Sequence, residues 1–230
     1  MTKRLEQIYR MIPRNAKGIA DIGTDHAIIP VALALSGCSA CLTASDVASQ
    51  PLQRAMETAE RSGVRDRIRF VQCDGLDACK PEQTDCIVIA GMGGDTVCRI
   101  LDRAEWIQER EVTLVLQPMT HAEVLRYWLL HNGFIITLEA TVAEDRHLYQ
   151  VFRAKNGSAP SLSDAEYLVG AFDSAREGVS LSDLCRAELL RIEKKLEGLY
   201  AAGQSDGAEA LFYCGIQEEL IKQLGAAAEV

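Results

Sequence analysis

The sequence lacks an apolar run long enough to cross a membrane, and among its 230 residues it has only two tryptophans and five phenylalanines. The missing run excludes a conventional transmembrane helix, and the polar opening Met1-Thr2-Lys3-Arg4 is unlike a secretory signal peptide. The sequence also lacks a second CxxC pair to accompany Cys38 and Cys41, so no metal site is expected. Eight scattered cysteines are typical of a protein of the reducing cytoplasm.

Positive charge is scarce, because 24 basic residues face 33 acidic ones and the net charge is −9. This balance argues against a nucleic-acid partner, but the distribution weakens that argument. Residues 1–156 carry 18 basic and 20 acidic side chains, whereas residues 157–230 carry 6 and 13. The first region is therefore nearly neutral. Several basic side chains in this region are compatible either with an RNA partner or with an ordinary solvated face. They are Arg65, Arg67, Arg69, Arg99, Arg103, Arg146, Arg153 and Lys155.

Apolar segments alternate between strand-like and helix-like patterns through the first region, which predicts five βα units after an N-terminal helix. The expected helices cover residues 2–12, 28–35, 51–61, 95–103 and 122–131, and the expected strands cover 18–22, 41–45, 67–72, 86–90 and 112–116.

Two further β-rich segments, 134–142 and 147–154, are joined by only four residues. So short a link joins antiparallel strands, because a parallel crossover needs a dozen residues or more. We therefore expect an α/β fold with a mostly parallel seven-stranded sheet of order 3-2-1-4-5-7-6, whose last strand is antiparallel. Nicotinamide-binding Rossmann folds generally lack the closing hairpin, whereas class I methyltransferases have it.

The composition shifts to helix formers after Asn156, which predicts a domain over 1–156 and an appendage over 157–230. Ser163 with Glu166 and Ser180 with Asp183 have the spacing of capping pairs. Apolar residues then recur in three- and four-residue steps, which is typical of a coiled-coil-like seam. We expect a C-terminal helical hairpin with a returning helix over 211–224. The seam residues are Leu181, Cys185, Leu189, Ile192, Leu196 and Leu199.

Polar and glycine residues follow four successive predicted strands, and the carboxyl ends of parallel strands meet at one edge of a sheet. The segment Ala20–His26 (ADIGTDH) has no GxGxxG motif, so it lacks the glycines that seat a diphosphate on a helix N-terminus. Acidic groups in their place repel phosphates and attract a cation. S-adenosylmethionine carries a sulfonium and an ammonium, and it is the expected cofactor. Its predicted binding residues are Asp21, Gly23, Thr24, Asp25, His26, Asp46, Val47, Asp74, Gly75, Ala90, Gly91 and Met92.

Each of these features has an alternative interpretation that needs no ligand. Asp46, expected to bind the ribose hydroxyls, has the position of a helix N-cap, and Asp74-Gly75 is also compatible with a simple turn. Gly91–Gly94 fits a tight junction between a strand and a helix, and His26 fits a satisfied core histidine. Their placement at consecutive strand ends favours the binding site.

The chain resembles the bacterial tRNA (adenine-22-N1)-methyltransferases, often called TrmK. The resemblance rests on RLEQIYRMIP, ADIGTDH, SDV, PLQRA, DGL, VIAGMGG, LQP, LRYWLLHNGF and EDRHLYQV, which lie within the first 155 residues. It implies methylation of adenine N1 in the D-arm region of tRNA and a C-terminal coiled coil that helps to hold the tRNA. Ile28 stands where the family more often has an aromatic residue, and Met119 where it often has Asn.

Adenine N1 has a free lone pair at neutral pH, so its methylation needs alignment rather than a strong base. The base must be turned out of its stack to reach a pocket. We expect Gln117 or a backbone carbonyl of the glycine loop, Gly91–Gly94, to hydrogen-bond the adenine edge. We expect Asp25 to favour the cationic product. Tyr127, Trp128 and Tyr149 are candidates for stacking or for core packing. The predicted substrate-binding residues are Gly93, Gly94, Gln117, Pro118 and Met119.

Two other functions are compatible with the sequence. One is transfer from the same cofactor to a small molecule or a protein, and the other is a non-catalytic nucleoside-binding scaffold. The expected partner is tRNA, with neither a membrane nor a metal, and the helical tail is a candidate surface for self-association.

Overall fold

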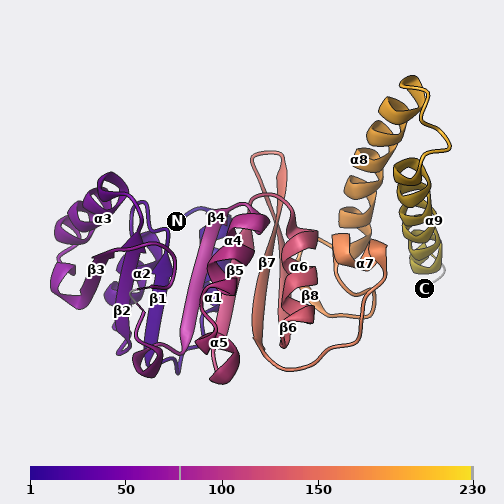
Figure 1. Ribbon diagram of the computed structural model, residues 1–230. Coiled ribbons are helices and arrows are strands. Elements are labelled where there is room, and N and C mark those ends of the chain that lie inside the picture. The colour runs from indigo at the N-terminus through magenta and orange to yellow at the C-terminus, as the bar shows by residue number, and fades with distance from the viewer. Residues whose placement is uncertain (78, 229–230) are drawn as a thin grey trace.

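An eight-stranded sheet runs through the centre of the molecule in the computed structural model, which describes residues 1–77 and 79–228 (Figure 1). The strand order is β3-β2-β1-β4-β5-β7-β6-β8. The strands are β1 (Gly18–Ile22), β2 (Cys41–Asp46), β3 (Ile68–Gln72), β4 (Cys86–Met92), β5 (Thr113–Pro118), β6 (Phe134–Glu144), β7 (His147–Asn156) and β8 (Arg176–Gly178).

The predicted order of seven strands is confirmed. Strands β1 to β5 are parallel, and β7 lies antiparallel between β5 and β6. The sequence interpretation missed β8, which pairs in parallel with β6 through only three residues. Its sequence, Arg-Glu-Gly, has no apolar alternation that would indicate a strand.

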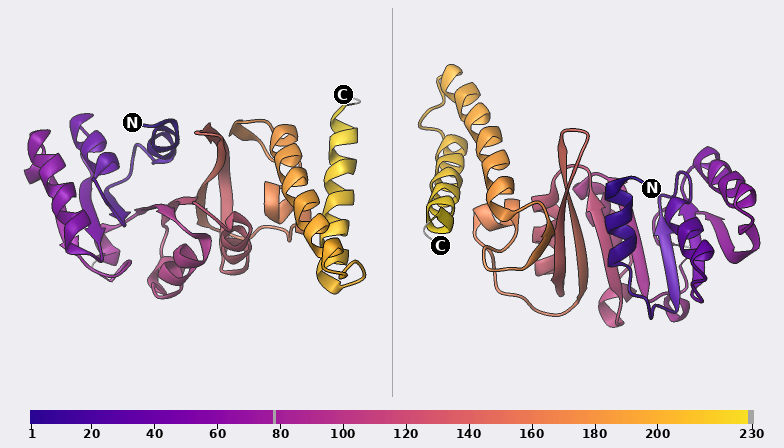
Figure 2. Two further views of the ribbon diagram at one scale, coloured as in Figure 1. Left: turned by 90° about the horizontal axis from the view of Figure 1, so that it is seen from above. Right: turned by 180° about the vertical axis from the view of Figure 1, so that it is seen from behind.

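Helices cover both faces of the sheet, as Figure 2 shows. Their side chains form two separate cores, because alternate residues of a strand point to opposite faces. In β4, Val88 packs with α1 to α3, and Ile87 and Ile89 pack with α4 to α6. All three are fully buried, as expected of a central parallel strand. The helices are α1 (Lys3–Met11), α2 (Ile28–Leu35) and α3 (Ser49–Arg61) on one face, and α4 (Gly94–Asp102), α5 (Trp106–Glu109) and α6 (Ala122–His131) on the other, with the short 3-10 turns η1 (Arg65–Arg67) and η2 (Pro81–Gln83).

The C-terminal segment contains α7 (Asp164–Val169), α8 (Leu181–Ala201) and α9 (Ala208–Ala228). The predicted capping pairs are confirmed, since the hydroxyls of Ser163 and Ser180 accept hydrogen bonds from the backbone N–H groups three residues on. Helices α8 and α9 form the predicted hairpin, which rises past the carboxyl edge of the sheet (Figure 1). The division at residue 156 stays a prediction, and β8 joins the sheet from beyond it.

A buried arginine connects the sheet to the helical hairpin. Arg126 of α6 is fully buried, and its guanidinium donates to Glu139 of β6 at 3.1 Å and to Gln150 of β7 at 2.6 Å. The same guanidinium donates to the carbonyl of Tyr167 in α7. A buried charge is tolerated only when its hydrogen bonds are satisfied, so this network fixes α7, and α8 after it, against the sheet.

None of the helices within the described residues combines the length and the apolar character needed to cross a bilayer.

Candidate active site

A cleft of about 270 Å³ lies at the carboxyl ends of β1, β2, β3 and β4, and α4 forms one of its walls. Six predicted cofactor residues line it: Gly23, Asp46, Val47, Asp74, Gly75 and Met92. The other six, Asp21, Thr24, Asp25, His26, Ala90 and Gly91, are in the same loops but outside the lining. The lining residues that the sequence interpretation missed are Ile22, Cys73, Thr96, Arg99, Ile100 and Arg103.

Two glycines give the cleft its shape. Gly23 has φ +75°, and a Cβ there would lie 2.0 Å from Cε of Met92, so a side chain would displace Met92 from the wall. Its N–H donates to the carbonyl of Ser45 at 2.8 Å, which ties the loop after β1 to β2. Gly91 has φ +82°, and the pairing of β4 with β5 shifts register between Ala90 and Met92. This bulge turns the end of β4 so that Met92 lines the cleft.

Asp46 is half-buried at the end of β2, and one carboxylate oxygen accepts a hydrogen bond from the N–H of Ala48 at 2.8 Å. The N-cap of α3 is Ala48 itself, and no side chain caps this helix. The N-cap interpretation of Asp46 is therefore wrong. One carboxylate oxygen stabilises the turn to Ala48. The carboxylate also lines the cleft, where it can accept further hydrogen bonds.

Asp74 follows β3, which neighbours β2, and its carboxylate is paired with the guanidinium of Arg103 in α4. The same guanidinium binds Asp77 at 2.6 Å. Thr96, Arg99 and Arg103 follow one face of α4 at helical spacing. That spacing, directly after the glycine loop, is the signal that could have identified α4 as a wall of the site.

Buried polar groups surround the end of β1. Asp21 is 9% exposed, and burial raises its pKa from 3.8 to about 6. The buried hydroxyls of Thr24 and Ser45 have no hydrogen-bond partner among the described residues. Buried polar groups are nearly always satisfied in folded proteins, so the two hydroxyls point to a polar occupant beside them, and the neighbouring carboxyl of Asp21 suits a cationic one. The residues present therefore fit a nucleoside that bears positive charge.

The buried carboxyl of Asp21 predicts a pH-dependent stability. The folded chain binds this proton more tightly than the unfolded chain, so the stabilisation is fully present below pH 4 and is lost as the pH rises through about 6. Relative to Asp21→Asn, we expect the free energy of unfolding of the wild type to fall by about 2 kcal/mol between pH 4 and pH 6. Urea unfolding of both proteins measures this, with Asp173→Asn, an exposed carboxylate, as the control. Parallel curves for the wild type and Asp21→Asn would refute the burial argument.

Asp25, a predicted catalytic residue, is exposed and outside the cleft lining. Its carboxylate accepts a hydrogen bond from Nε of Arg54 at 3.0 Å, and Nε2 of His26 lies 3.5 Å away. His26 is also exposed, so it is not a core histidine. The charge of Asp25 is thus balanced locally by Arg54. Its proposed effect on a cationic product stays a prediction.

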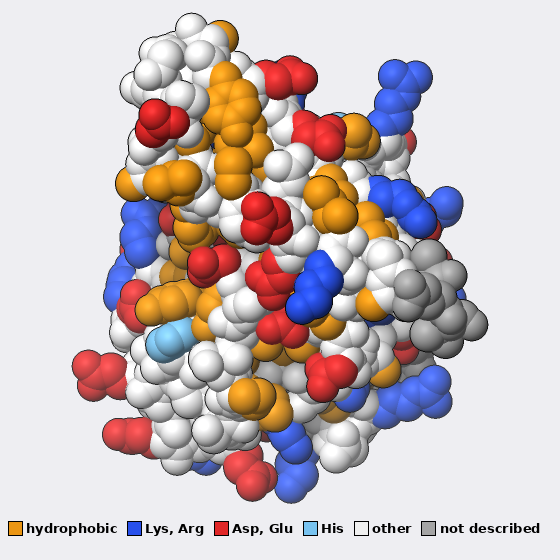
Figure 3. All heavy atoms as spheres, turned by 90° about the vertical axis from the view of Figure 1, so that its right-hand side faces the viewer, with side chains coloured by type: hydrophobic (Ala, Val, Ile, Leu, Met, Phe, Trp, Pro, Cys, Tyr) orange, Lys and Arg blue, Asp and Glu red, His pale blue; other side chains and the backbone are white. Residues whose placement is uncertain are grey.

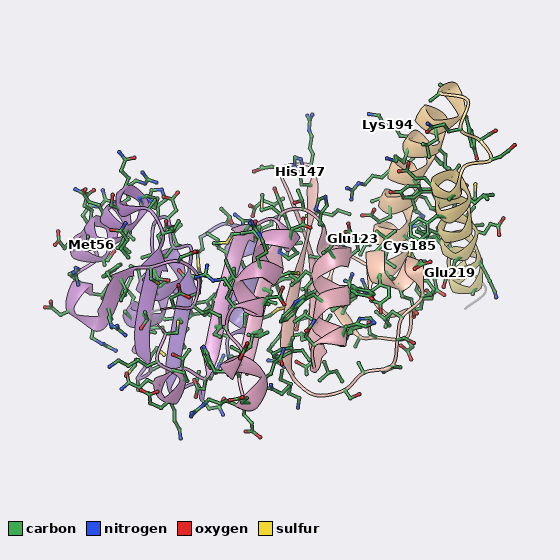
Figure 4. All side chains as sticks on the ribbon, viewed as in Figure 1. Met56, Glu123, His147, Cys185, Lys194 and Glu219 are labelled. Carbon is green, nitrogen blue, oxygen red and sulfur yellow. The ribbon has the colours of Figure 1, made fainter. Side chains whose placement is uncertain are left out.

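A second cavity, of about 370 Å³, lies between the turn after β5 and helix α8. Pro118 and Met119 line it, whereas Gly93, Gly94 and Gln117 do not. Figure 4 shows Glu123 on the side of α6 that faces the helical hairpin, and it also lines the cavity. The remaining lining residues are Thr120, His121, Ala122, Leu148, Gln150, Leu168, Glu188, Arg191, Ile192, Lys195 and Tyr213.

The glycine loop after β4 and the turn after β5 are held together by backbone contacts. The N–H of Met119 donates to Met92 at 2.7 Å, and the N–H of Gly94 donates to Thr120 at 2.8 Å. A Cβ on Gly94 would lie 2.1 Å from the carbonyl oxygen of His121. Gly94 therefore permits a close approach of two backbones, and the cofactor cleft and the second cavity share this pair of loops as their common wall.

Gln117 lies fully buried at the end of β5, with both ends of its amide bonded. Its carbonyl oxygen accepts from Nη1 of Arg4, and its amide nitrogen donates to the carbonyl of Pro118 at 2.7 Å. Arg4 belongs to α1, on the face of the sheet opposite to α4 and α6. In this arrangement Gln117 supports the turn from behind, and its contact with the adenine edge stays a prediction.

The three aromatic candidates have different environments. Trp128 is buried, donates to Asp102 at 2.6 Å and packs on Phe134, so it belongs to the core. Tyr127 is 53% exposed and stacks on His131, and the ring of Tyr149 lies beside the guanidinium of Arg4.

The methyltransferase-domain family matches residues 1–152. The tRNA (adenine(22)-N(1))-methyltransferase of Bacillus subtilis is 32% identical over 182 residues, which cover 79% of this chain and 71% of that protein. This chain belongs to the tRNA (adenine(22)-N(1))-methyltransferase, or TrmK, family.

Solved structures of TrmK relatives cover the C-terminal hairpin as well. The B. subtilis m1A22 tRNA methyltransferase TrmK is 29% identical with a TM-score of 0.74, and the match covers 100% of this chain and 97% of that one. A candidate tRNA (m1A22) methyltransferase of Streptococcus pneumoniae, solved in complex with S-adenosyl-L-methionine, is 27% identical with a TM-score of 0.78 over 97% and 99% of the two chains. The hairpin is therefore part of the fold that these TrmK structures share.

Proposed function

We propose that this protein transfers a methyl group from S-adenosylmethionine to N1 of adenine 22 in tRNA. The observation that carries the proposal is the cleft at the strand ends, in which the carboxylates of Asp46 and Asp74 follow consecutive strands and no diphosphate-binding glycine motif is present. The B. subtilis and S. pneumoniae relatives, with the activity and the bound cofactor that their names state, support it.

The residues of the cleft have separate parts in holding the cofactor. Asp46 would accept hydrogen bonds from the ribose hydroxyls, and Asp74, which also lines the cleft, would bind the adenine edge. Asp21 and the unpaired hydroxyls of Thr24 and Ser45 would face the charged amino-acid portion. When bound, S-adenosylmethionine supplies an electrophilic methyl group on a cationic sulfur.

The chain's own contribution to the reaction is alignment. The loops that meet at Met92 and Met119 border both the cleft and the second cavity. A base would have to enter over this border so that its N1 contacts the methyl group directly. Apolar side chains of Pro118, Met119 and Leu148 line that cavity on one part of its surface. Holding two reactants in line in this way accounts for roughly 7–11 kcal/mol of barrier reduction in well-oriented systems.

A tRNA transcript tests the proposal directly. Incubation with S-adenosylmethionine, nuclease digestion and mass spectrometry should yield 1-methyladenosine from a transcript with adenine at position 22. A transcript with guanine at position 22 should yield none. Equal methylation of both transcripts would contradict the assignment of the acceptor. Binding of S-adenosylhomocysteine without transfer to any tRNA would favour a small-molecule or protein acceptor, or a non-catalytic scaffold.

We place the protein in the cytoplasm, where tRNA is modified.

Self-association through the helical tail stays a prediction. Hydrophobic side chains lie exposed on the α9 side of the molecule (Figure 3), and the large ones on this helix are Leu211, Phe212 and Ile221. Light scattering after gel filtration should give a dimer mass for the wild type and a monomer mass for a Leu211→Ser, Ile221→Ser variant. A monomer mass for the wild type would refute the prediction.

A further inference from the structure

A side chain of the N-terminal helix, that of Arg4, contacts Gln117 at the end of β5. We propose that Arg4 is a positioning residue for methyl transfer, because it fixes Gln117 and thereby the Pro118–Met119 turn that borders the second cavity, which is called the acceptor cavity below. This inference rests on the proposed function for its kinetic test but has a separate structural test.

Gln117 connects Arg4 to the turn, because its side chain is held in one orientation. It is fully buried, its carbonyl oxygen accepts from Arg4, and its amide nitrogen donates to Pro118 at 2.7 Å and lies 3.7 Å from Sδ of Met119. Without Arg4, the carbonyl oxygen would be buried without a donor, which strongly disfavours the present side-chain orientation. The amide would then turn, and Pro118 and Met119 would lose their contacts with it.

Arg4 is itself held in place by two other elements. Its backbone N–H donates to the carboxylate of Glu144 at the end of β6 at 3.0 Å, and its guanidinium carbon lies 5.4 Å from the ring centroid of Tyr149 in β7. A guanidinium over an aromatic face is attracted by the ring quadrupole. The end of the β6–β7 hairpin thus orients Arg4 toward Gln117, and Figure 4 shows His147 at the tip of this hairpin, beside the carboxyl edge of the sheet.

The turn that Gln117 supports is part of the wall between the two cavities. Met119 donates its N–H to Met92, which lines the cofactor cleft, while the Met119 side chain lines the acceptor cavity. A small movement of this turn would change the alignment of the acceptor with the methyl group. It would leave untouched the carboxylates Asp46 and Asp74 that hold the cofactor.

The first test is kinetic. Arg4→Ala should lower kcat about tenfold while the Kd of S-adenosylhomocysteine stays within about twofold, because misalignment affects the transition state and not cofactor binding. Arg4→Lys should restore part of kcat, since an ammonium can still donate to Gln117. Gln117→Ala should act like Arg4→Ala, and the double variant should be no slower than the slower single variant. Arg10→Ala, an exposed residue of the same helix paired with Glu6, is the matched control.

The second test needs no activity. In methyl-labelled methionine NMR spectra, Arg4→Ala should shift or broaden the signal of Met119, assigned with Met119→Leu, and leave the signal of Met56 unchanged. Met56 lies on α3 at the far end of the molecule (Figure 4). Unchanged Met119 signals, or a lowered melting temperature with unchanged kcat, would overturn the inference. A wild type that methylates no tRNA would overturn the proposed function instead, and the NMR result would still decide whether Arg4 positions the turn.

Discussion

Replacing Asp46 by alanine is expected to weaken the binding of S-adenosylhomocysteine about 100-fold. Asp46 lines the cleft at the end of β2 and is open to a ligand with part of its carboxylate. Hydrogen bonds to a charged group contribute about 1.5–3 kcal/mol each, and a loss of about 2.7 kcal/mol corresponds to a 100-fold change in Kd. Isothermal titration calorimetry measures this effect directly.

The fold should be preserved in Asp46→Ala, because the backbone bonds of β2 to β1 and β3 do not involve its side chain. Asp66→Ala provides the matched control, since Asp66 is an exposed carboxylate of η1 outside the cleft lining. An unchanged affinity in Asp46→Ala would show that its carboxylate serves only the turn to Ala48.

Replacing Gly94 by alanine is expected to lower kcat by more than about 100-fold, because the added methyl group must push apart the two loops that align the reactants. Its Cβ would lie 2.1 Å from the carbonyl oxygen of His121 and 3.1 Å from that of Thr120, and both are backbone atoms that cannot rotate away. Overpacking of this kind also costs about 1–3 kcal/mol of stability. Steady-state kinetics with tRNA and thermal unfolding measure the two effects.

Gly198→Ala is the control for this substitution. Gly198 also lies in a helix with φ in the ordinary range, and a Cβ there meets no atom within 4 Å. Alanine should therefore stabilise α8 by up to about 1 kcal/mol and leave kcat unchanged. If Gly94→Ala behaved in the same way, the contact between the loops would have no part in catalysis.

Most of the fold followed from local properties of the sequence. The four-residue link between β6 and β7 admits only antiparallel strands, and apolar runs such as Cys86–Ala90 identify buried central strands. Strand β8 could not be found in this way, because Arg176–Gly178 has no apolar alternation and pairs with Glu139–Thr141 through only three residues. No side-chain pattern encodes such a contact.

The carboxylates of the site were predictable for a related reason, since parallel strands bring their carboxyl ends to one edge. The orientation of individual side chains was not. Gln117 is turned toward Arg4, which is 113 residues away in the sequence, and Asp25 is paired with Arg54, 29 residues on. These pairs depend on how helices pack on the sheet, which the residue pattern around Gln117 or Asp25 does not specify.

The carboxylates of Asp46 and Asp74, in a cleft without a diphosphate-binding glycine motif, carry the assignment of the cofactor. Competitive calorimetric titration with S-adenosylmethionine and NAD tests it most directly. This arrangement predicts saturable binding of S-adenosylmethionine that an excess of NAD does not displace. Tight binding of NAD at the same site, with no heat from the sulfonium compound, would contradict it.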